Sequence, residues 1–189
     1  MRSGKAPHPR RSINACSSGS FFPILAKPDP ALGYFNGVLR FWLGWAQETA
    51  GDHAAAQESW QRARSELESF LKEQPENFNL LGDLALTNMG LGDKTAALAL
   101  SERAMAANPV EKDAVAGPIP IEVLARVAAR MGEPDRAIAA LQQLLSIPYY
   151  GALAAGIPLT PAMLRLDPMF DPLRSDPRFQ ELVASPAPQ

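Results

Sequence analysis

The chain has 189 residues, of which 47% are hydrophobic and 7% aromatic, and its formal net charge at pH 7 is −2. This length fits one domain with a sizeable core. The nearly balanced charge argues against a nucleic-acid partner, because such proteins carry strongly basic surfaces. The single cysteine, Cys16, excludes an internal disulfide framework and a cysteine-rich metal site. We therefore expect no cofactor and no bound metal.

Residues 1–30 are predicted to form a disordered tail or linker. They are rich in basic residues and serine, contain five prolines, and cannot bury enough apolar surface to fold alone. The apolar run at residues 21–26 is short and is interrupted by Pro23, so it is a poor match to the core of a secretory signal peptide. No stretch is long and apolar enough for a transmembrane helix, and we expect a cytoplasmic chain without membrane insertion.

Large apolar residues crowd the first expected helix. A helix that is apolar nearly all round is normally buried on more than one side. Three explanations remain open: the tail folds back over this helix, another part of a longer polypeptide precedes it, or it is a contact site that allows self-association. The residues concerned are Tyr34, Phe35, Val38, Leu39, Phe41, Trp42, Leu43 and Trp45.

Three glycine–acid pairs follow at nearly equal spacing. They are Gly51-Asp52, Gly92-Asp93 and Gly132-Glu133. The steps between them are 41 and 40 residues, and each pair has a leucine eight residues before the glycine, a small residue seven before it and an alanine five after it. Glycine can end one helix in the left-handed conformation, and an acidic residue favours the start of the next. The period therefore predicts helix hairpins stacked as a solenoid, an architecture that usually binds partners.

The residues around these turns resemble the tetratricopeptide repeat (TPR) family. The second repeat matches the family pattern best, with Leu81, Leu84, Ala85, Gly92, Ala97, Ala104 and Pro109. The first repeat has Leu43, Gly44, Gly51, Ala56, Trp60 and Ala63, and the third has Ile121, Leu124, Ala125, Gly132, Ala137, Leu141 and Pro148. The resemblance implies an all-α, right-handed α-solenoid of three TPR-like hairpins at about residues 31–75, 76–109 and 119–148.

The chain departs from the family pattern in three places. Its period is longer than the usual 34 residues. The second helix of the first repeat continues through Lys72 before Pro75, and a loop at residues 110–120 separates the second and third repeats. These departures affect the regularity of the superhelix rather than the hairpins.

Residues 151–189 are predicted to form a C-terminal cap of short helices. Asp-Pro occurs at residues 167, 171 and 176; aspartate is a good N-cap and proline suits the first helical position. Six apolar residues are expected to anchor the cap on the third hairpin: Leu164, Leu166, Phe170, Leu173, Phe179 and Leu182. The segment also resembles the end of bacterial multidomain regulators, in which TPR repeats follow a kinase, adenylate cyclase or winged-helix domain.

The sequence offers no catalytic constellation. His8, His53 and Cys16 have no partners at the spacing of a known nucleophile or acid–base motif. We therefore predict a non-catalytic protein–protein interaction module, a scaffold or adaptor that binds a peptide or helix in its concave groove. The alternative is the C-terminal regulatory or sensing part of a larger bacterial kinase, cyclase or winged-helix transcription regulator.

In the TPR fold the first helix of each hairpin lines the groove, and this implies which positions contact a partner. The sequence lacks the Lys and Asn clamp with which some TPR proteins hold a terminal carboxylate, so an apolar helix or extended segment is the expected ligand. The candidate partner-binding residues are Phe41, Trp45, Glu48, Asn79, Leu86, Met89, Glu122, Arg126 and Arg130.

Overall fold

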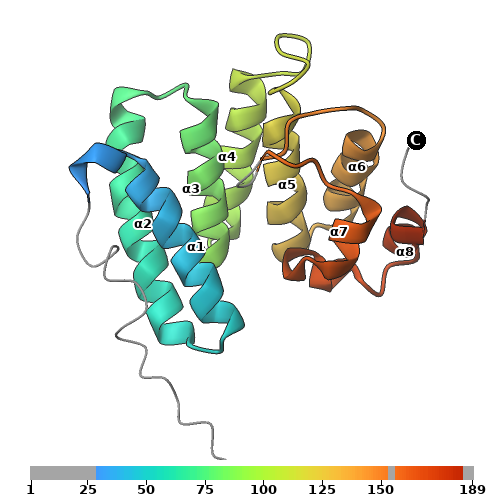
Figure 1. Cartoon of the computed structure of the whole chain (residues 1–189), viewed down its shortest axis with the longest axis horizontal. Helices are drawn as coiled ribbons and strands as arrows, with labels where there is room; N and C mark the ends of the chain where they lie inside the picture. Colours follow the sequence, from blue (N-terminus) through green and yellow to red (C-terminus); the bar gives the residue numbers. More distant parts are fainter. Residues whose placement is uncertain (1–28, 153–155, 185–189) are drawn as a thin grey trace, which may run out of the picture.

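Three helix hairpins form the body of the molecule. The computed structural model describes residues 29–152 and 156–184, and all regular structure in these residues is helical. The long helices are α1 (Phe35–Thr49), α2 (His53–Glu73), α3 (Phe78–Gly90), α4 (Lys94–Ala107), α5 (Pro118–Arg130) and α6 (Pro134–Leu145). They pack as the pairs α1–α2, α3–α4 and α5–α6, and each pair packs on the next (Figure 1). The prediction of an all-α fold built from packed helix pairs is confirmed.

Short helices follow and precede this body. After the third hairpin come α7 (Pro161–Leu166), the 3-10 helix η3 (Pro168–Leu173) and α8 (Pro177–Ala184), and before the first lies the 3-10 helix η2 (Pro30–Leu32). The predicted disordered tail lies outside the described residues except for its last two, Asp29 and Pro30. Asp29 caps η2 by accepting a hydrogen bond from the backbone N–H of Ala31.

The turns within the hairpins follow the glycine–acid pairs. Gly51, Gly92 and Gly132 have φ angles of 85°, 79° and 74°, which side chains on other residues would disfavour. Asp52 and Asp93 then cap α2 and α4. Each carboxylate accepts a hydrogen bond from the backbone N–H three residues later, at 3.2 and 3.0 Å.

The third turn departs from this pattern. Glu133 makes no capping hydrogen bond, and Pro134 occupies the first position of α6. The Glu133 carboxylate instead lies 2.5 Å from Nζ of Lys94 at the start of α4. This ion pair holds the pKa of Glu133 below its ordinary value. The acid of the third pair therefore joins neighbouring repeats, because its longer side chain reaches past its own helix.

The contribution of the Asp93 cap to stability can be compared with that of the Glu133–Lys94 ion pair. We expect Asp93→Ala to lower the free energy of unfolding by about 1 kcal/mol, the ordinary cost of losing a capping carboxylate. Glu133→Ala is the matched control, and we expect a smaller loss because exposed ion pairs stabilise little. Urea titration followed by circular dichroism would compare the two. An equal loss in both variants would contradict the assigned roles.

The hairpin interiors depend on small residues. Ala85 and Ala97 are fully buried in one core cluster, and Ala125 and Ala137 are fully buried in another, as the spacing predicts. In the first hairpin the small residue Gly44 makes room for an aromatic ring instead, since a Cβ built there would lie 2.5 Å from Nε1 of Trp60.

Trp60 links the first two hairpins. Its indole Nε1 donates a hydrogen bond to the backbone oxygen of Phe41 at 3.2 Å. A Cβ on Gly90 would lie 2.5 Å from the same ring, so glycines of α1 and α3 both leave space for it. Leu43, the leucine eight residues before Gly51 in the repeat pattern, is only half-buried.

The long helix α2 confirms the predicted extension of the first repeat, but one of its acids does not lie on a solvated face. Glu66 accepts a hydrogen bond from Nε of Arg40 at 2.8 Å, and the Arg40 side chain is 6% exposed. Glu66 thus supplies the counter-charge that the buried guanidinium on α1 requires.

Candidate functional site

The C-terminal segment crosses the inner face of α5 and is held there by a buried polar network. Arg126 and Glu122 are neighbours on α5, and each side chain is 1% exposed. The Nη2 atom of Arg126 lies 2.9 Å from Oε1 of Glu122, and Nη1 lies 2.5 Å from Oδ2 of Asp167. The guanidinium also lies over the ring of Phe170, 5.1 Å from its centre. Arg126 thereby connects α5 to the residues around η3.

The second oxygen of Glu122 extends the network. It accepts hydrogen bonds from the hydroxyl of Tyr149 and from the backbone N–H of Ala152, each at 3.0 Å. The Tyr149 oxygen accepts in turn from the backbone N–H of Leu159 at 2.8 Å. Burial, and then the negative charge of Glu122, raise the pKa of Tyr149, so this hydroxyl remains a donor at neutral pH.

The predicted anchors of this segment are confirmed in part. Leu164, Phe170, Leu173 and Phe179 belong to the core cluster of the third hairpin, and Leu182 packs partly buried against it. Leu166 was predicted wrongly, since its side chain is 80% exposed. It lies two residues after Leu164 at the end of α7, about 200° around the helix, and so points away from the side that Leu164 buries.

Two of the three Asp-Pro pairs begin helices. Asp167 caps η3 by accepting from the backbone N–H of Met169, and Asp176 accepts from that of Arg178 at the start of α8. The pair at residue 171 lies inside η3 and starts no helix. A cap absent from the prediction is Thr160, whose hydroxyl accepts from the backbone N–H of Met163 in α7.

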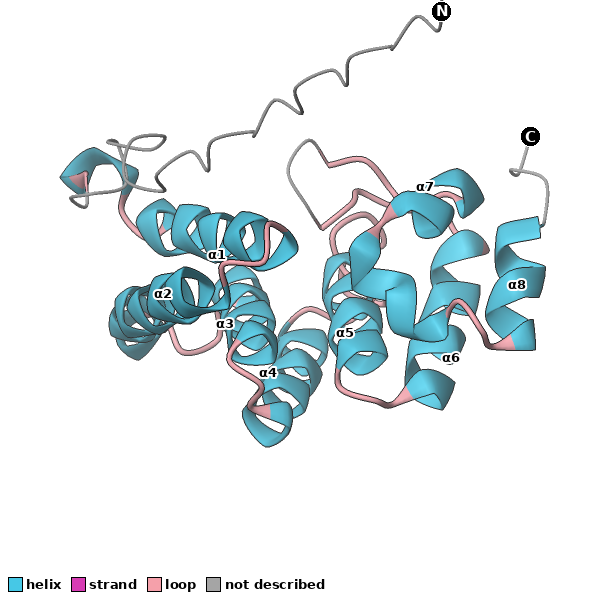
Figure 2. Cartoon of the chain, turned by 90° about the horizontal axis from the view of Figure 1, so that it is seen from below, coloured by secondary structure: helices cyan, strands magenta, loops and turns pink. Residues whose placement is uncertain are grey.

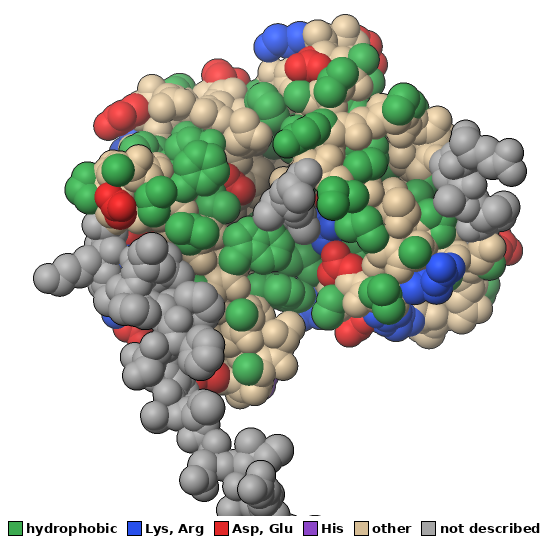
Figure 3. Space-filling model, in the orientation of Figure 1, with side chains coloured by type: hydrophobic (Ala, Val, Ile, Leu, Met, Phe, Trp, Pro, Cys, Tyr) green, Lys and Arg blue, Asp and Glu red, His purple; other side chains and the backbone are tan. Residues whose placement is uncertain are grey.

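An open groove remains between α1 and the C-terminal segment. In Figure 2 these two parts stand on either side, with α3 and α5 between them. The groove has a volume of about 450 Å³. Figure 3 views the molecule from this side and shows apolar side chains gathered along α1 and across its centre. The groove is lined by Tyr34, Phe35, Val38, Leu39, Trp42, Asn79, Asp83, Leu86, Ile119, Tyr150, Gly151, Ala152 and Gly156.

Several of the apolar side chains in this groove are exposed to solvent. Phe35 is 52% exposed, Leu39 39% and Tyr150 56%. Phe35 stacks on Tyr34 with ring centres 4.6 Å apart. The groove is therefore an apolar surface with aromatic side chains, the composition that favours binding of another apolar segment.

Asp83 is the acidic residue of this groove. Burial raises its pKa to about 7. No residue in the described parts of the chain donates a hydrogen bond to its carboxylate or pairs with it, although its backbone oxygen accepts from Thr87. Tyr34 lines the same groove, and burial, and then the charge of Asp83, raise the pKa of Tyr34. A cation or hydrogen-bond donor that enters the groove could therefore bind the Asp83 carboxylate without displacing another described side chain.

Comparison with known families agrees with the helix pairs described above. Residues 48–111 match one model of the tetratricopeptide repeat, and residues 124–147 match a second model of the same repeat. Residues 48–147 contain tetratricopeptide repeats. Searches among curated proteins and among solved structures found no match. TPR hairpins typically serve as protein–protein interaction modules.

The structure places the nine predicted groove residues of the three hairpins in four different surroundings. Asn79 and Leu86 line the open groove, although Leu86 is 2% exposed and belongs to its buried floor. Glu122 and Arg126 belong to the buried network, where a partner could reach them only if the C-terminal segment moved away. Phe41 is 2% exposed and belongs to the core, so it is not available on the surface of the first helix.

The remaining four candidates meet at the far ends of α1, α3 and α5. Trp45, Glu48, Met89 and Arg130 line a second hollow of about 100 Å³. The guanidinium of Arg130 lies over the Trp45 ring, 5.3 Å from its centre. This contact joins the first and third TPR hairpins across the inner face, so this hollow is already spanned by the chain's own side chains.

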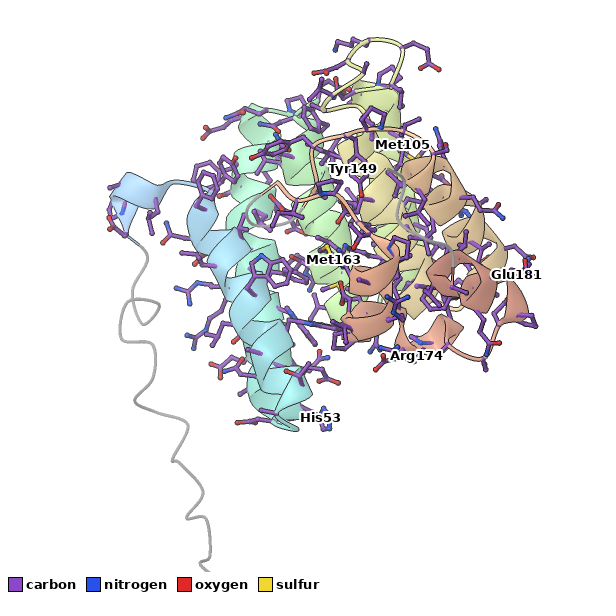
Figure 4. The ribbon with its side chains drawn as sticks, turned by 45° about the vertical axis from the view of Figure 1, so that its right-hand side comes forward. His53, Met105, Tyr149, Met163, Arg174 and Glu181 are labelled. Atoms are coloured by element: carbon purple, nitrogen blue, oxygen red, sulfur yellow. The ribbon has the colours of Figure 1, made fainter. Side chains whose placement is uncertain are left out.

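His53 lies beside this hollow and pairs with one of its residues. Figure 4 shows it at the end of the α1–α2 hairpin, on the surface. Its Nδ1 lies 2.8 Å from Oε2 of Glu48. The hydrogen bond to this carboxylate, and then its charge, raise the pKa of His53.

This pairing predicts the pH dependence of one residue. We expect His53 to titrate above the ordinary pKa of about 6.5, and Glu48→Gln to return the pKa of His53 towards that value. Since the folded-state pKa is raised, the pair stabilises the fold fully at pH below the unfolded value, and this contribution is lost as the pH rises through the folded one. NMR titration of the imidazole, with His8→Gln for assignment, measures it. An identical pKa with and without Glu48 would refute the pairing.

The described residues give no sign of a metal centre or a membrane span. Across residues 29–152 and 156–184, no three His, Asp or Glu side chains are grouped as metal ligands. Within the same ranges no helix combines the length and apolarity needed to cross a bilayer.

Sequence reasoning missed the part of the site that comes from outside the first helices. Tyr150, Gly151 and Ala152 follow the third hairpin and form the far wall of the groove. Asp83 was missed although it lies on a predicted groove helix, four residues after Asn79, which is one helical turn. That spacing was the available signal, since residues one turn apart share a face.

Proposed function

We propose that the chain is a non-catalytic TPR scaffold that binds an apolar helix or extended segment of another protein in the groove between α1 and the C-terminal segment. The observation that carries this proposal is the exposure of Phe35, Leu39 and Tyr150 in one concave surface. Apolar side chains that are exposed together on a concave surface usually mark a binding site. The matched TPR repeats support a protein partner rather than a small molecule.

The C-terminal segment limits where on the inner face a partner can bind. It already covers Glu122 and Arg126, so the inner face of the third hairpin is filled by the chain itself. What remains open lies over α1 and α3. We therefore propose that the partner contacts the first two hairpins and the wall formed by residues 150–152.

Affinity capture with the full chain as bait tests the proposal. We expect Leu39→Asp to abolish capture of the partner, because a charge in an apolar contact is costly to desolvate. The matched control is Leu166→Asp, which alters an equally large leucine that is 80% exposed and lies outside the groove. A partner retained by Leu166→Asp and lost by Leu39→Asp supports the groove. Equal capture by both variants would place the binding surface elsewhere.

A further inference from the structure

The open groove combines two features that call for a particular kind of occupant. Its wall on α1 exposes Phe35 and Leu39, which need apolar cover. Between α1 and α5 lies Asp83, whose carboxylate has no partner among the residues that the structure describes. An occupant that fits both has apolar side chains together with basic ones.

The N-terminal segment of the chain itself, residues 1–28, has this chemistry. It contains five Lys or Arg residues and no Asp or Glu, whereas the rest of the chain contains thirteen Lys or Arg and twenty Asp or Glu. The segment is thus positive and the body that it is attached to is negative. Its strongest apolar run, Phe21-Phe22-Pro23-Ile24-Leu25, is followed closely by Lys27.

The attachment point of this segment lies beside the groove. The backbone N–H of Asp29 donates to Oδ1 of Asn36 at 2.9 Å, and Nδ2 of Asn36 donates to the backbone oxygen of Asp29 at 2.8 Å. These bonds fix the chain at the start of α1, where Tyr34 and Phe35 line the groove.

Length and connectivity also favour this occupant. An extended stretch of seven residues spans about 23 Å, at about 3.3 Å per residue. Asp29 is already held at the start of α1, where Tyr34 and Phe35 line the groove, so residues 21–27 can lie along the groove with only residue 28 as the connection. A tethered segment of this kind has an effective concentration on the order of millimolar, so even a weak contact would be populated.

We propose that residues 21–27 occupy the groove of the free protein, with the apolar run Phe21–Leu25 against α1 and Lys27 facing Asp83. A protein partner that binds the groove would then compete with this segment. This inference does not depend on the proposed function, because the segment can occupy the groove of the free chain even if no other protein ever binds there.

The unique cysteine provides the test in the full chain. A nitroxide attached to Cys16 lies five residues before Phe21 and broadens NMR signals of nearby groups. We expect the indole signal of Trp42 and the amide signals of Leu39 and Asp83 to lose most of their intensity. Amides of Arg174 and Glu181, in η3–α8 and outside the groove, serve as the reference and should keep theirs. Unchanged groove signals would overturn the proposal.

Two further samples separate the possible sources of broadening. In the labelled double variant Phe21→Ser, Phe22→Ser, we expect the groove signals to recover, and persistence of the broadening would overturn the proposal. In a mixture of unlabelled Cys16→Ser chain carrying the NMR isotopes and spin-labelled chain without them, we expect no broadening. Broadening of similar size in that mixture would show that a second copy is the occupant and would overturn it as well.

Discussion

Arg126→Met is expected to lower the free energy of unfolding by about 3–5 kcal/mol, the usual cost of removing one partner from a buried ion pair. The variant keeps most of the volume of the side chain and removes its charge. Glu122, with a 1% exposed side chain, would then be left buried without a cation beside it. Asp167 would lose the contact that ties η3 to α5. Denaturant titration followed by circular dichroism measures the loss.

Two further variants test whether the loss of stability in Arg126→Met arises from the burial of its ion pair. Arg62→Met removes an arginine that pairs with Glu58 on the surface of α2, and we expect a loss below about 1 kcal/mol. Adding Glu122→Gln to Arg126→Met should recover much of the stability, because the amide oxygen still accepts from Tyr149 without an unpaired charge. If Arg126→Met cost no more than Arg62→Met, the network would not be buried in solution.

The buried network also explains why part of the site could not be predicted. The spacing of Glu122 and Arg126, four residues apart, predicts that both lie on one face of α5. What spacing within one helix cannot give is the distance to Asp167, 41 residues further along the chain, which decides that this face is covered. Local pattern fixes which way a side chain points; long-range packing decides what it meets there.

The same distinction runs through the fold. The turns were predictable because Gly92 and Asp93 act through the conformation and hydrogen bonds of their own backbone. The core position of Phe41 was not, since an aromatic residue on an inward face suits a partner and a core equally well. Leu166 failed for a related reason: it lies two residues after the buried Leu164, about 200° around a helix of six residues, and therefore on the opposite side.

Trp60→Ala is expected to cost about 3–5 kcal/mol, as large-to-small changes of buried aromatic residues do. The ring is 2% exposed and packs where α1 and α3 both carry a glycine, Gly44 and Gly90. These neighbours belong to helices whose backbones are held by their own hairpins, so they cannot collapse into the space that the ring leaves. Trp45→Ala is the matched control, with a smaller expected loss because Trp45 is only partly buried.

Gly44 lies on the other side of the contact with Trp60, and enlarging it should also destabilise the fold. Gly44→Ala would place a Cβ 2.5 Å from Nε1 of Trp60, and the ring or the helix must shift to admit it. We expect the single variant to be destabilised, by about 1–3 kcal/mol as overpacked cores are. In the double variant with Trp60→Ala the clash disappears, so the two losses should fall short of additivity by more than about 0.5 kcal/mol. Additive losses in a thermodynamic cycle would mean that Gly44 does not face the Trp60 ring. The close packing of this ring against the glycine of α1 would then be refuted.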